Sequence, residues 1–221
     1  MSLANLIYRV IPTSDLKEYL DHVVVYDLTE PFMNALEFNP DAAQVLLESP
    51  ARINPNCVLP NGNTALTHAI LTHQFDCAKL LIDGLDTSRP GANVDARDRN
   101  GTVPIVAVVK SVYSGDEACL QVAKKLLETC DANRDDIQGV TALYHLACNR
   151  AKPTTWDFRR FSDTGAIIAA ARVNWLRLEL AALLMDHGGD PTYILDDETP
   201  SPRAMALSHE DFDLYEILND F

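Results

Sequence analysis

Two histidines lie at the same place in a stretch that the chain contains twice. NGNTALTHAI, residues 61–70, includes His68, and QGVTALYHLA, residues 138–147, includes His145. A histidine exchanges protons near neutral pH and is a common metal ligand, so both are candidates for acid–base or ligand chemistry. A whole repeat separates the two side chains, and a shared metal ion is therefore not expected.

The motifs of known catalytic sites do not accompany these histidines. The sequence contains no Gly-x-Ser-x-Gly, no phosphate-binding loop, no Gly-x-Gly-x-x-Gly and no His-Glu-x-x-His. No cysteine and histidine set has zinc spacing, so no catalytic residue, metal or cofactor is predicted. A second possibility is an enzyme or small-molecule binder. Its pocket would lie in a groove of the fold and be covered by an insert at residues 149–174, with His68, His145 and Asp157 near it.

Acidic side chains outnumber basic ones by 32 to 18, and the formal net charge is −14. The pairs Asp135-Asp136 and Asp196-Asp197 are expected on turns, where Asp bonds to the nearby backbone. Nucleic acid is disfavoured as a partner, because phosphate binding needs a Lys and Arg cluster that the chain lacks. The charge favours another protein with a basic patch, although solubility alone also explains it.

Length and cysteine content limit the class of protein. The 221 residues, 47% of them apolar, suffice for one compact domain or one short array. The start lacks a secretion signal, and no run of about 18 apolar residues could span a membrane. Five cysteines without paired spacing indicate reduced thiols. We therefore expect a cytoplasmic or nuclear protein that is neither secreted nor membrane-bound.

An internal repeat provides the elements that position these residues. Gly62, Gly101 and Gly139 each precede an apolar helical segment, which a second helix and a polar link follow. One such unit cannot bury its apolar face alone, whereas stacked units bury a continuous core. Thr64 and Thr141 are expected to open their helices. The residues expected to fill the seam or to allow close helix approach are Leu66, Ile105, Leu143, Ala69, Ala107 and Ala147.

The pattern resembles the ankyrin repeat, whose signature centres on Thr-Pro-Leu-His-x-Ala with a period of about 33 residues. Thr64–Ala69 keeps the Thr, Leu and Ala of that signature, and Pro104-Ile105 keeps the Pro and an apolar residue. The resemblance implies an all-α ankyrin-repeat solenoid of stacked helix-turn-helix units with short hairpin-like links. Degenerate units flank the clear ones: Asn39 opens a helix in the first, and Thr199-Pro200 marks the last. The family also places Asn133 at a hairpin end, where it closes the turn.

The expected organisation is a helical N-terminal cap at residues 1–30 and an array of about five units at residues 31–221. The insert at about residues 149–174 delays the second helix of the fourth unit until about Trp175. It carries Trp156, a residue type common in binding hot spots. The insert either roofs the groove or packs back on the repeats and lengthens the outer helix.

In the ankyrin family the inner helices and hairpin tips make the binding surface. The resemblance therefore implies a non-catalytic protein–protein interaction module, an adaptor or regulator. His68 and His145 would border the concave groove. Arg203 would lie there too if Thr199-Pro200 opens the last inner helix. Each histidine could instead bond to a neighbouring turn. The sequence leaves the oligomeric state open. The residues expected to bind the partner are His68, Arg97, Arg99, Asn100, Lys110, Asp136, Gln138, Tyr144, His145, Asn149, Trp156 and Arg203.

Overall fold

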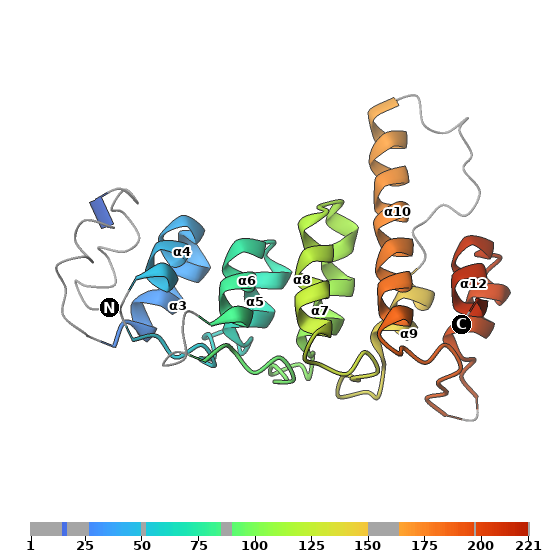
Figure 1. The fold of residues 1–221 in the computed structure, drawn as a ribbon, viewed down its shortest axis with the longest axis horizontal. Helices are drawn as coiled ribbons and strands as arrows, with labels where there is room; N and C mark the ends of the chain where they lie inside the picture. The colour runs from blue at the N-terminus through green and yellow to red at the C-terminus, as the bar shows by residue number, and fades with distance from the viewer. Residues whose placement is uncertain are drawn as a thin grey trace. The chain divides into compact units, whose positions relative to one another are not determined.

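The computed structural model describes residues 15–16, 27–49, 52–84, 90–149, 164–196 and 198–220. The chain divides into two compact units, Met1–Asn100 and Gly101–Phe221, and each is described by itself. The described part of the first unit holds two helix pairs (Figure 1). These are α3 (Thr29–Phe38) with α4 (Pro40–Glu48), and α5 (Ala65–Leu71) with α6 (Phe75–Asp83).

The second unit continues the pattern with three helix pairs in its described residues. They are α7 (Pro104–Ser111) with α8 (Ala118–Leu127), α9 (Ala142–Cys148) with α10 (Thr164–Asp186), and α11 (Pro202–Ser208) with α12 (Phe212–Asn219). A short 3-10 helix, η1 (Val112–Ser114), follows α7. We call the first helix of each pair the inner helix and the second the outer helix. The described residues form isolated β-bridges but no strand, so the all-α prediction is confirmed.

Side-chain caps mark the starts of several helices. Thr64 accepts a hydrogen bond from the backbone N–H of Thr67, and Thr141 accepts one from the N–H of Tyr144. Such caps satisfy backbone donors that a helix leaves unpaired in its first turn. Asn39 caps α4 in the same way, with Pro40 at the first helical position. The three helix starts predicted at these positions are therefore confirmed.

The register expected for the last unit is wrong. Ser201, rather than Thr199, caps α11, and its side chain accepts a bond from the N–H of Ala204. The chain contains Thr-Pro-Ser-Pro here, so either proline could follow a cap, and the hydroxyl of Ser201 is the one that faces the first helical turn. Met205 therefore holds the position of His68, and Arg203 lies in the first turn of α11, half-buried.

The predicted seam residues lie in the core of their units. Leu66 in the first unit and Ile105 and Leu143 in the second are almost fully buried. Each such side chain stabilises the fold by about 1.5–3 kcal/mol through burial. The small residues Ala69, Ala107 and Ala147 are also buried, as expected from the repeat.

The repeated glycines have a common geometric cause. Gly62, Gly101 and Gly139 have φ angles of 89°, 75° and 78°, in the left-handed region that favours glycine. A side chain of the following link also covers the glycine: Arg99 lies directly over Gly62, and Ile137 lies directly over Gly101. The backbone N–H groups of Arg99 and Ile137 donate to the carbonyls of these glycines, at 2.8 and 3.1 Å. Each glycine thus lets one link dock on the one before it.

Asn133 bridges two links of the second unit rather than closing only its own turn. Its Nδ2 donates to the carbonyl of Gly188 at 2.8 Å, and its Oδ1 accepts from the N–H of Asp190 at 2.6 Å. Asn56 holds the equivalent place in the first unit, where its Oδ1 accepts from the N–H of Asn93 at 2.7 Å. An asparagine at this position therefore fastens consecutive repeats together.

Replacing Asn133 with alanine is expected to lower the free energy of unfolding by about 1–3 kcal/mol, because both bonds are lost. Asn133→Asp keeps an acceptor for Asp190 but no donor for Gly188, so an intermediate loss is expected. Urea unfolding followed by circular dichroism measures both variants. An Asn133→Ala variant as stable as the wild type would contradict the bridging role.

Two parts of the expected organisation fall largely outside the described residues. These are the cap at residues 1–30, of which the structure describes residues 15–16 and 27–30, and the insert residues 150–163, which include Trp156. Helix α10 begins at Thr164 rather than at about Trp175. The end of the insert is therefore continuous with the outer helix.

Candidate functional site

The first unit holds four of the predicted binding residues. Arg97, Arg99 and Asn100 are exposed in the link that precedes Gly101. The N–H of Asn100 donates to Oδ1 of Asp98 at 2.8 Å, which fixes the turn that carries them. These three side chains therefore lie on a loop of defined shape, as a preformed binding surface requires.

His68, the fourth predicted residue of this unit, is only 6% exposed. Its Nδ1 lies 3.2 Å from Nδ2 of Asn61, a donor, so the ring nitrogen accepts from the turn just before α5. Burial is the largest influence on the pKa of His68 and lowers it, against the opposing effects of the Glu37 charge and of a bond to the backbone of Leu36. The imidazole ring of His68 is therefore neutral near pH 7, and it is bonded to the turn before its own helix.

Mild acid is expected to destabilise the first unit through His68. The pKa of this side chain is lower in the folded chain than its ordinary value of 6.5, so the unfolded chain binds the proton more tightly. The stability that His68 contributes is present above pH 6.5 and is lost as the pH falls toward the folded pKa. Urea unfolding at about pH 7.5 and about pH 5.5 should therefore show a smaller acid loss for His68→Gln than for the wild type. Equal losses would contradict this assignment.

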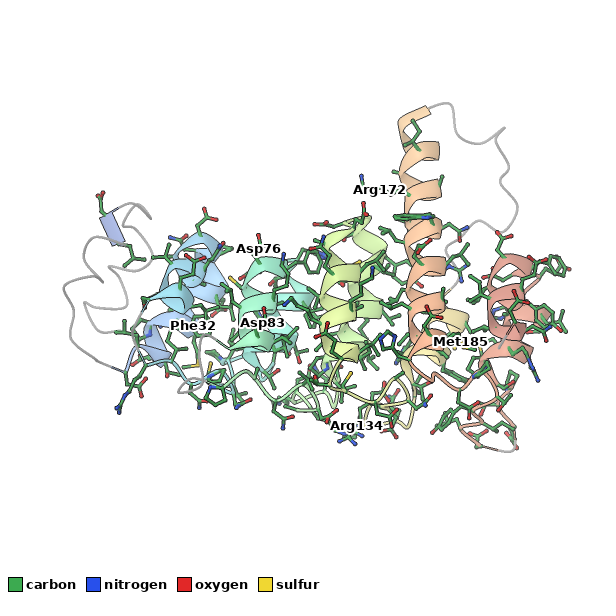
Figure 2. All side chains as sticks on the ribbon, viewed as in Figure 1. Phe32, Asp76, Asp83, Arg134, Arg172 and Met185 are labelled. Carbon is green, nitrogen blue, oxygen red and sulfur yellow. The ribbon has the colours of Figure 1, made fainter. Side chains whose placement is uncertain are left out.

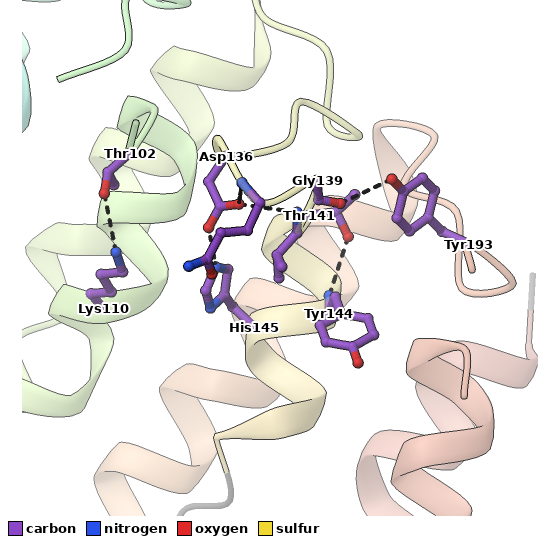
Figure 3. Close-up of polar contacts among 10 residues, drawn as sticks. Thr102, Lys110, Asp136, Gly139, Thr141, Tyr144, His145 and Tyr193 are labelled. Atoms are coloured by element: carbon purple, nitrogen blue, oxygen red, sulfur yellow. Dashed lines mark hydrogen bonds and ion pairs between the residues drawn. The ribbon is translucent and has the colours of Figure 1, made fainter. Parts of the chain in front are cut away.

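In the second unit, the buried Asp136 pairs with the half-buried His145 (Figure 3). Nε2 of His145 lies 3.0 Å from Oδ2 of Asp136, while Oδ1 accepts from the N–H groups of Gln138 and Val140 at 2.8 and 3.0 Å. Burial by itself would raise the pKa of Asp136, but the bonds from His145 and from these two backbone groups outweigh it and lower the pKa. The carboxylate therefore stays ionised and holds the turn before α9.

The two repeated histidines each bond to the turn before their helix, but to different chemical groups. A carboxylate that orients a histidine is half of a general-base arrangement. Here the same carboxylate also closes a turn, and the equivalent His68 is bonded to the amide of Asn61 instead of an acid. What both units retain is a ring that ties the inner helix to the turn before it. The alternative role given above for each histidine, a bond to the neighbouring turn, is therefore the observed one.

Lys110 and Gln138 are exposed on the second unit. Nζ of Lys110 donates to Oγ1 of Thr102 at 3.2 Å, so its ammonium group lies beside the start of α7 (Figure 3). The side chain of Gln138 extends from the tip of the turn that Asp136 holds. Both can reach a partner without any rearrangement of the fold.

Tyr144 and Asn149 lie at the two ends of α9 and differ in exposure. Tyr144 is buried, and burial raises the pKa of its phenol. Asn149 is exposed, and its carbonyl accepts from the hydroxyl of Tyr113 at 2.6 Å. Burial raises the pKa of that Tyr113 hydroxyl to about 12, so it remains a donor. This bond fixes the end of α9 at the point where residues 150–163 follow.

Sequence reasoning did not select two large apolar residues on the links of the second unit. Ile137, in the link before α9, is 70% exposed, and Ile194, in the link before α11, is 60% exposed. The sequence signal that could have identified Ile137 is a single isoleucine among acidic and turn-forming residues, as in DDIQG. Contiguous exposed apolar surface marks protein interaction sites, and these two side chains are candidates for such a surface.

Two kinds of feature are missing from the described part of the chain. Its histidine, cysteine and acidic side chains form no cluster of three that could hold a metal ion. None of its helices combines the length and the apolar character needed to cross a membrane.

Comparison with known proteins identifies the repeat. The family model for ankyrin repeats in many copies matches residues 33–82, which run from α3 to α6. No curated protein matches the chain in sequence.

Solved structures of ankyrin-repeat proteins resemble the whole chain. The ankyrin repeat protein EF0377 is 17% identical with a TM-score of 0.69, covering 99% of this chain and 97% of its own. An ankyrin repeat domain from Acinetobacter baumannii AYE is 16% identical with a TM-score of 0.68, covering 97% and 95%. The ankyrin repeat domain of Bcl-3, an IkappaB family member, is 18% identical with a TM-score of 0.62, covering 97% and 80%.

The predicted resemblance and fold are thus confirmed. The chain has the ankyrin-repeat fold, and its residues 33–82 match the family model itself. Ankyrin repeats are generally protein–protein interaction modules, and proteins of this family are typically not enzymes.

Proposed function

We propose that this chain, which has the ankyrin-repeat fold, is a non-catalytic adaptor or regulator that binds another protein through its inner helices and links. One observation carries the proposal: the exposed isoleucines Ile137 and Ile194 lie on consecutive links of the second unit. Burying such side chains in a partner releases apolar surface from water, which is the main favourable term in association. The links are held by hydrogen bonds before binding, so little ordering cost is expected.

Charge supports a partner with a basic patch. The link before α11, residues 187–201, contains Asp190, Asp196, Asp197 and Glu198 but no lysine or arginine. Asp196 and Glu198 are exposed beside Ile194. An apolar contact rimmed by carboxylates fits a partner surface in which lysines or arginines surround an apolar centre. Nucleic acid and membrane surfaces, which are acidic, are not proposed as partners.

Within the first unit, the proposal assigns partner contacts to Arg97, Arg99 and Asn100, the exposed residues of its last link. In the second unit it assigns them to Lys110, Gln138 and Asn149 together with the two isoleucines. Partner contact by the buried residues His68, Asp136 and Tyr144 stays a prediction, and the role that their contacts support is to shape the surface. A cytoplasmic or nuclear location is also proposed, because all five cysteines are free thiols.

The test compares proteins captured from a native lysate by the wild type and by an Ile137→Ala, Ile194→Ala double variant. Alanine at position 137 keeps the Cβ atom that lies over Gly101, so the link should remain docked. We expect a protein that the wild type retains and the double variant loses. With that protein purified, the dissociation constant should rise by about tenfold or more.

Phe212→Ala is the matched control for this experiment. Phe212 is 58% exposed at the start of the outer helix α12, away from the links, so its loss should leave capture unchanged. Circular dichroism must show that all variants are folded. Identical sets of captured proteins for wild type, double variant and control would refute the proposed surface.

A further inference from the structure

Helix α10 is much longer than its neighbours in the second unit. It contains 23 residues, whereas the outer helices α8 and α12 contain 10 and 8. Figure 1 shows its N-terminal turns extending past the ends of α8 and α12, and Figure 2 shows Arg172 on this extension. The ankyrin repeat needs only a short outer helix, so the extension requires another explanation.

The exposed side of α10 carries an apolar seam with heptad spacing. Ile168, Ala171, Trp175, Leu178 and Ala182 follow one another at alternating steps of three and four residues. This spacing places them along one face of a helix. Ile168 is 64% exposed and Trp175 is 45% exposed, while Leu178 and Ala182 are half-buried. The face therefore lies outside the core of its own unit.

The opposite side of α10 already has its partners. Leu176, Leu180 and Leu184 are almost fully buried within the second unit. A helix that is apolar on its outer side as well as its inner side is normally covered on both. The small side chains of Ala171 and Ala182, on either side of Trp175 along the seam, would let a second helix approach closely, and tryptophan is a frequent anchor in interfaces.

Two charged side chains beside the seam indicate which surface could pack against it. Arg172 and Glu179 are both exposed and flank Trp175 along the same edge of the seam. If a second α10 runs antiparallel across the first, Arg172 of each helix lies opposite Glu179 of the other, and the two Trp175 side chains meet near the centre. The seam is thus complementary to a reversed copy of itself, as a two-fold interface requires.

We infer that two copies of this chain associate through antiparallel pairing of their α10 helices. The balance of charge supports a second copy, because the seam carries one basic and one acidic side chain on a chain whose net charge is −14. Elsewhere acidic groups of two copies repel each other. A single helix pair gives an interface at the low end of specific contacts, roughly 1,200 Å² or less, so the dimer is reversible. This inference is independent of the proposed partner surface on the links.

Sedimentation velocity of the full chain over a range of concentrations tests the pairing. The wild type should shift from monomer to dimer as concentration rises. Arg172→Glu alone and Glu179→Arg alone should each weaken self-association by about tenfold or more, because each variant places like charges opposite one another. The double variant Arg172→Glu, Glu179→Arg restores both pairs and should recover the dimer. Its net charge equals that of the wild type, so general charge effects cancel.

Trp175→Ala should also abolish the dimer, with Glu198→Arg as a charge-matched control for Glu179→Arg. Glu198 is exposed on a link, so its reversal should leave the dimer intact. If Trp175→Ala fails to fold, the charge variants decide alone. A wild type that remains monomeric at every concentration would overturn the inference. A dimer that survives both single charge reversals would place the interface elsewhere and overturn it as well.

Discussion

The Asp211→Asn variant is expected to unfold with a free energy about 3–5 kcal/mol below that of the wild type, because it leaves a buried guanidinium without a counter-ion. Nη2 of Arg177 in α10 lies 2.8 Å from Oδ2 of Asp211, and the two side chains are only 3% and 9% exposed. Oδ1 of Asn174 accepts from the same nitrogen at 3.1 Å. Nε and Nη1 of Arg177 have no hydrogen-bond partner among the described residues. The carboxylate therefore provides most of the compensation for burying this charge.

Asparagine is the informative substitution at this position. Oδ1 of Asp211 also accepts from the N–H of Leu214 at 3.4 Å and caps α12. Asparagine is an equally good N-cap, so the variant removes the charge and keeps the cap. Asp213→Asn is the matched control, since it changes the net charge equally on the exposed first turn of the same helix. Its expected effect is within about 0.5 kcal/mol.

Urea unfolding followed by circular dichroism separates the outcomes. An Asp211→Asn variant that loses no more stability than Asp213→Asn would show that the ion pair is unimportant. A double variant, Arg177→Met with Asp211→Asn, removes both charges and should recover most of the loss. Failure to recover would instead assign the effect to packing of the Arg177 side chain.

Gly101→Ala is expected to lower the free energy of unfolding by roughly 2–5 kcal/mol, from two separate causes. The φ angle of 75° at Gly101 disfavours any side chain and costs about 1–2 kcal/mol. A Cβ atom there would also overlap the Cβ of Ile137, which no change of rotamer can move. The link before α9 would have to shift, and the 3.1 Å bond between the Ile137 N–H and the Gly101 carbonyl would weaken.

Gly188→Ala separates these two causes. Gly188 has a φ angle of 83°, but nothing lies within 4 Å of the place a Cβ would occupy. Its substitution should therefore cost only the backbone contribution, about 1–2 kcal/mol. Both variants are compared by the same urea unfolding. Equal losses would mean that Ile137 does not press on Gly101 and that the repeated glycines are retained for their backbone angle alone.

Much of the fold could be predicted from the sequence because its signals are local. A cap such as Thr64 acts on an N–H three residues away, and the spacing of Leu66 and Ala69 specifies one helical face. The last unit was misplaced because Thr199-Pro200 and Ser201-Pro202 are both valid helix starts within one short stretch. Only the geometry of the whole loop distinguishes them.

The candidate site was predicted less completely. The exposure of Arg97, Arg99 and Gln138 on links could be predicted because links carry turn signals, and their contact with a partner stays a prediction. His68 and Tyr144 were selected by their position in the family pattern and are buried in the structure. Ile137 was passed over, because sequence gives no measure of how far an apolar side chain on a turn is covered by its neighbours.

The sequence by itself determined that the chain contains a repeated helix pair, where α4, α5 and α9 start, and which residues of the repeat are buried in the core. Capping and helical periodicity depend on residues only a few positions apart, so both can be recognised from the sequence. Only the tertiary structure decided that Asp136 holds His145, that Arg177 pairs with Asp211 and that Ile168 and Trp175 of α10 are exposed. These facts depend on the packing of segments far apart in sequence, and burial sets both the charge state and the exposure of each side chain.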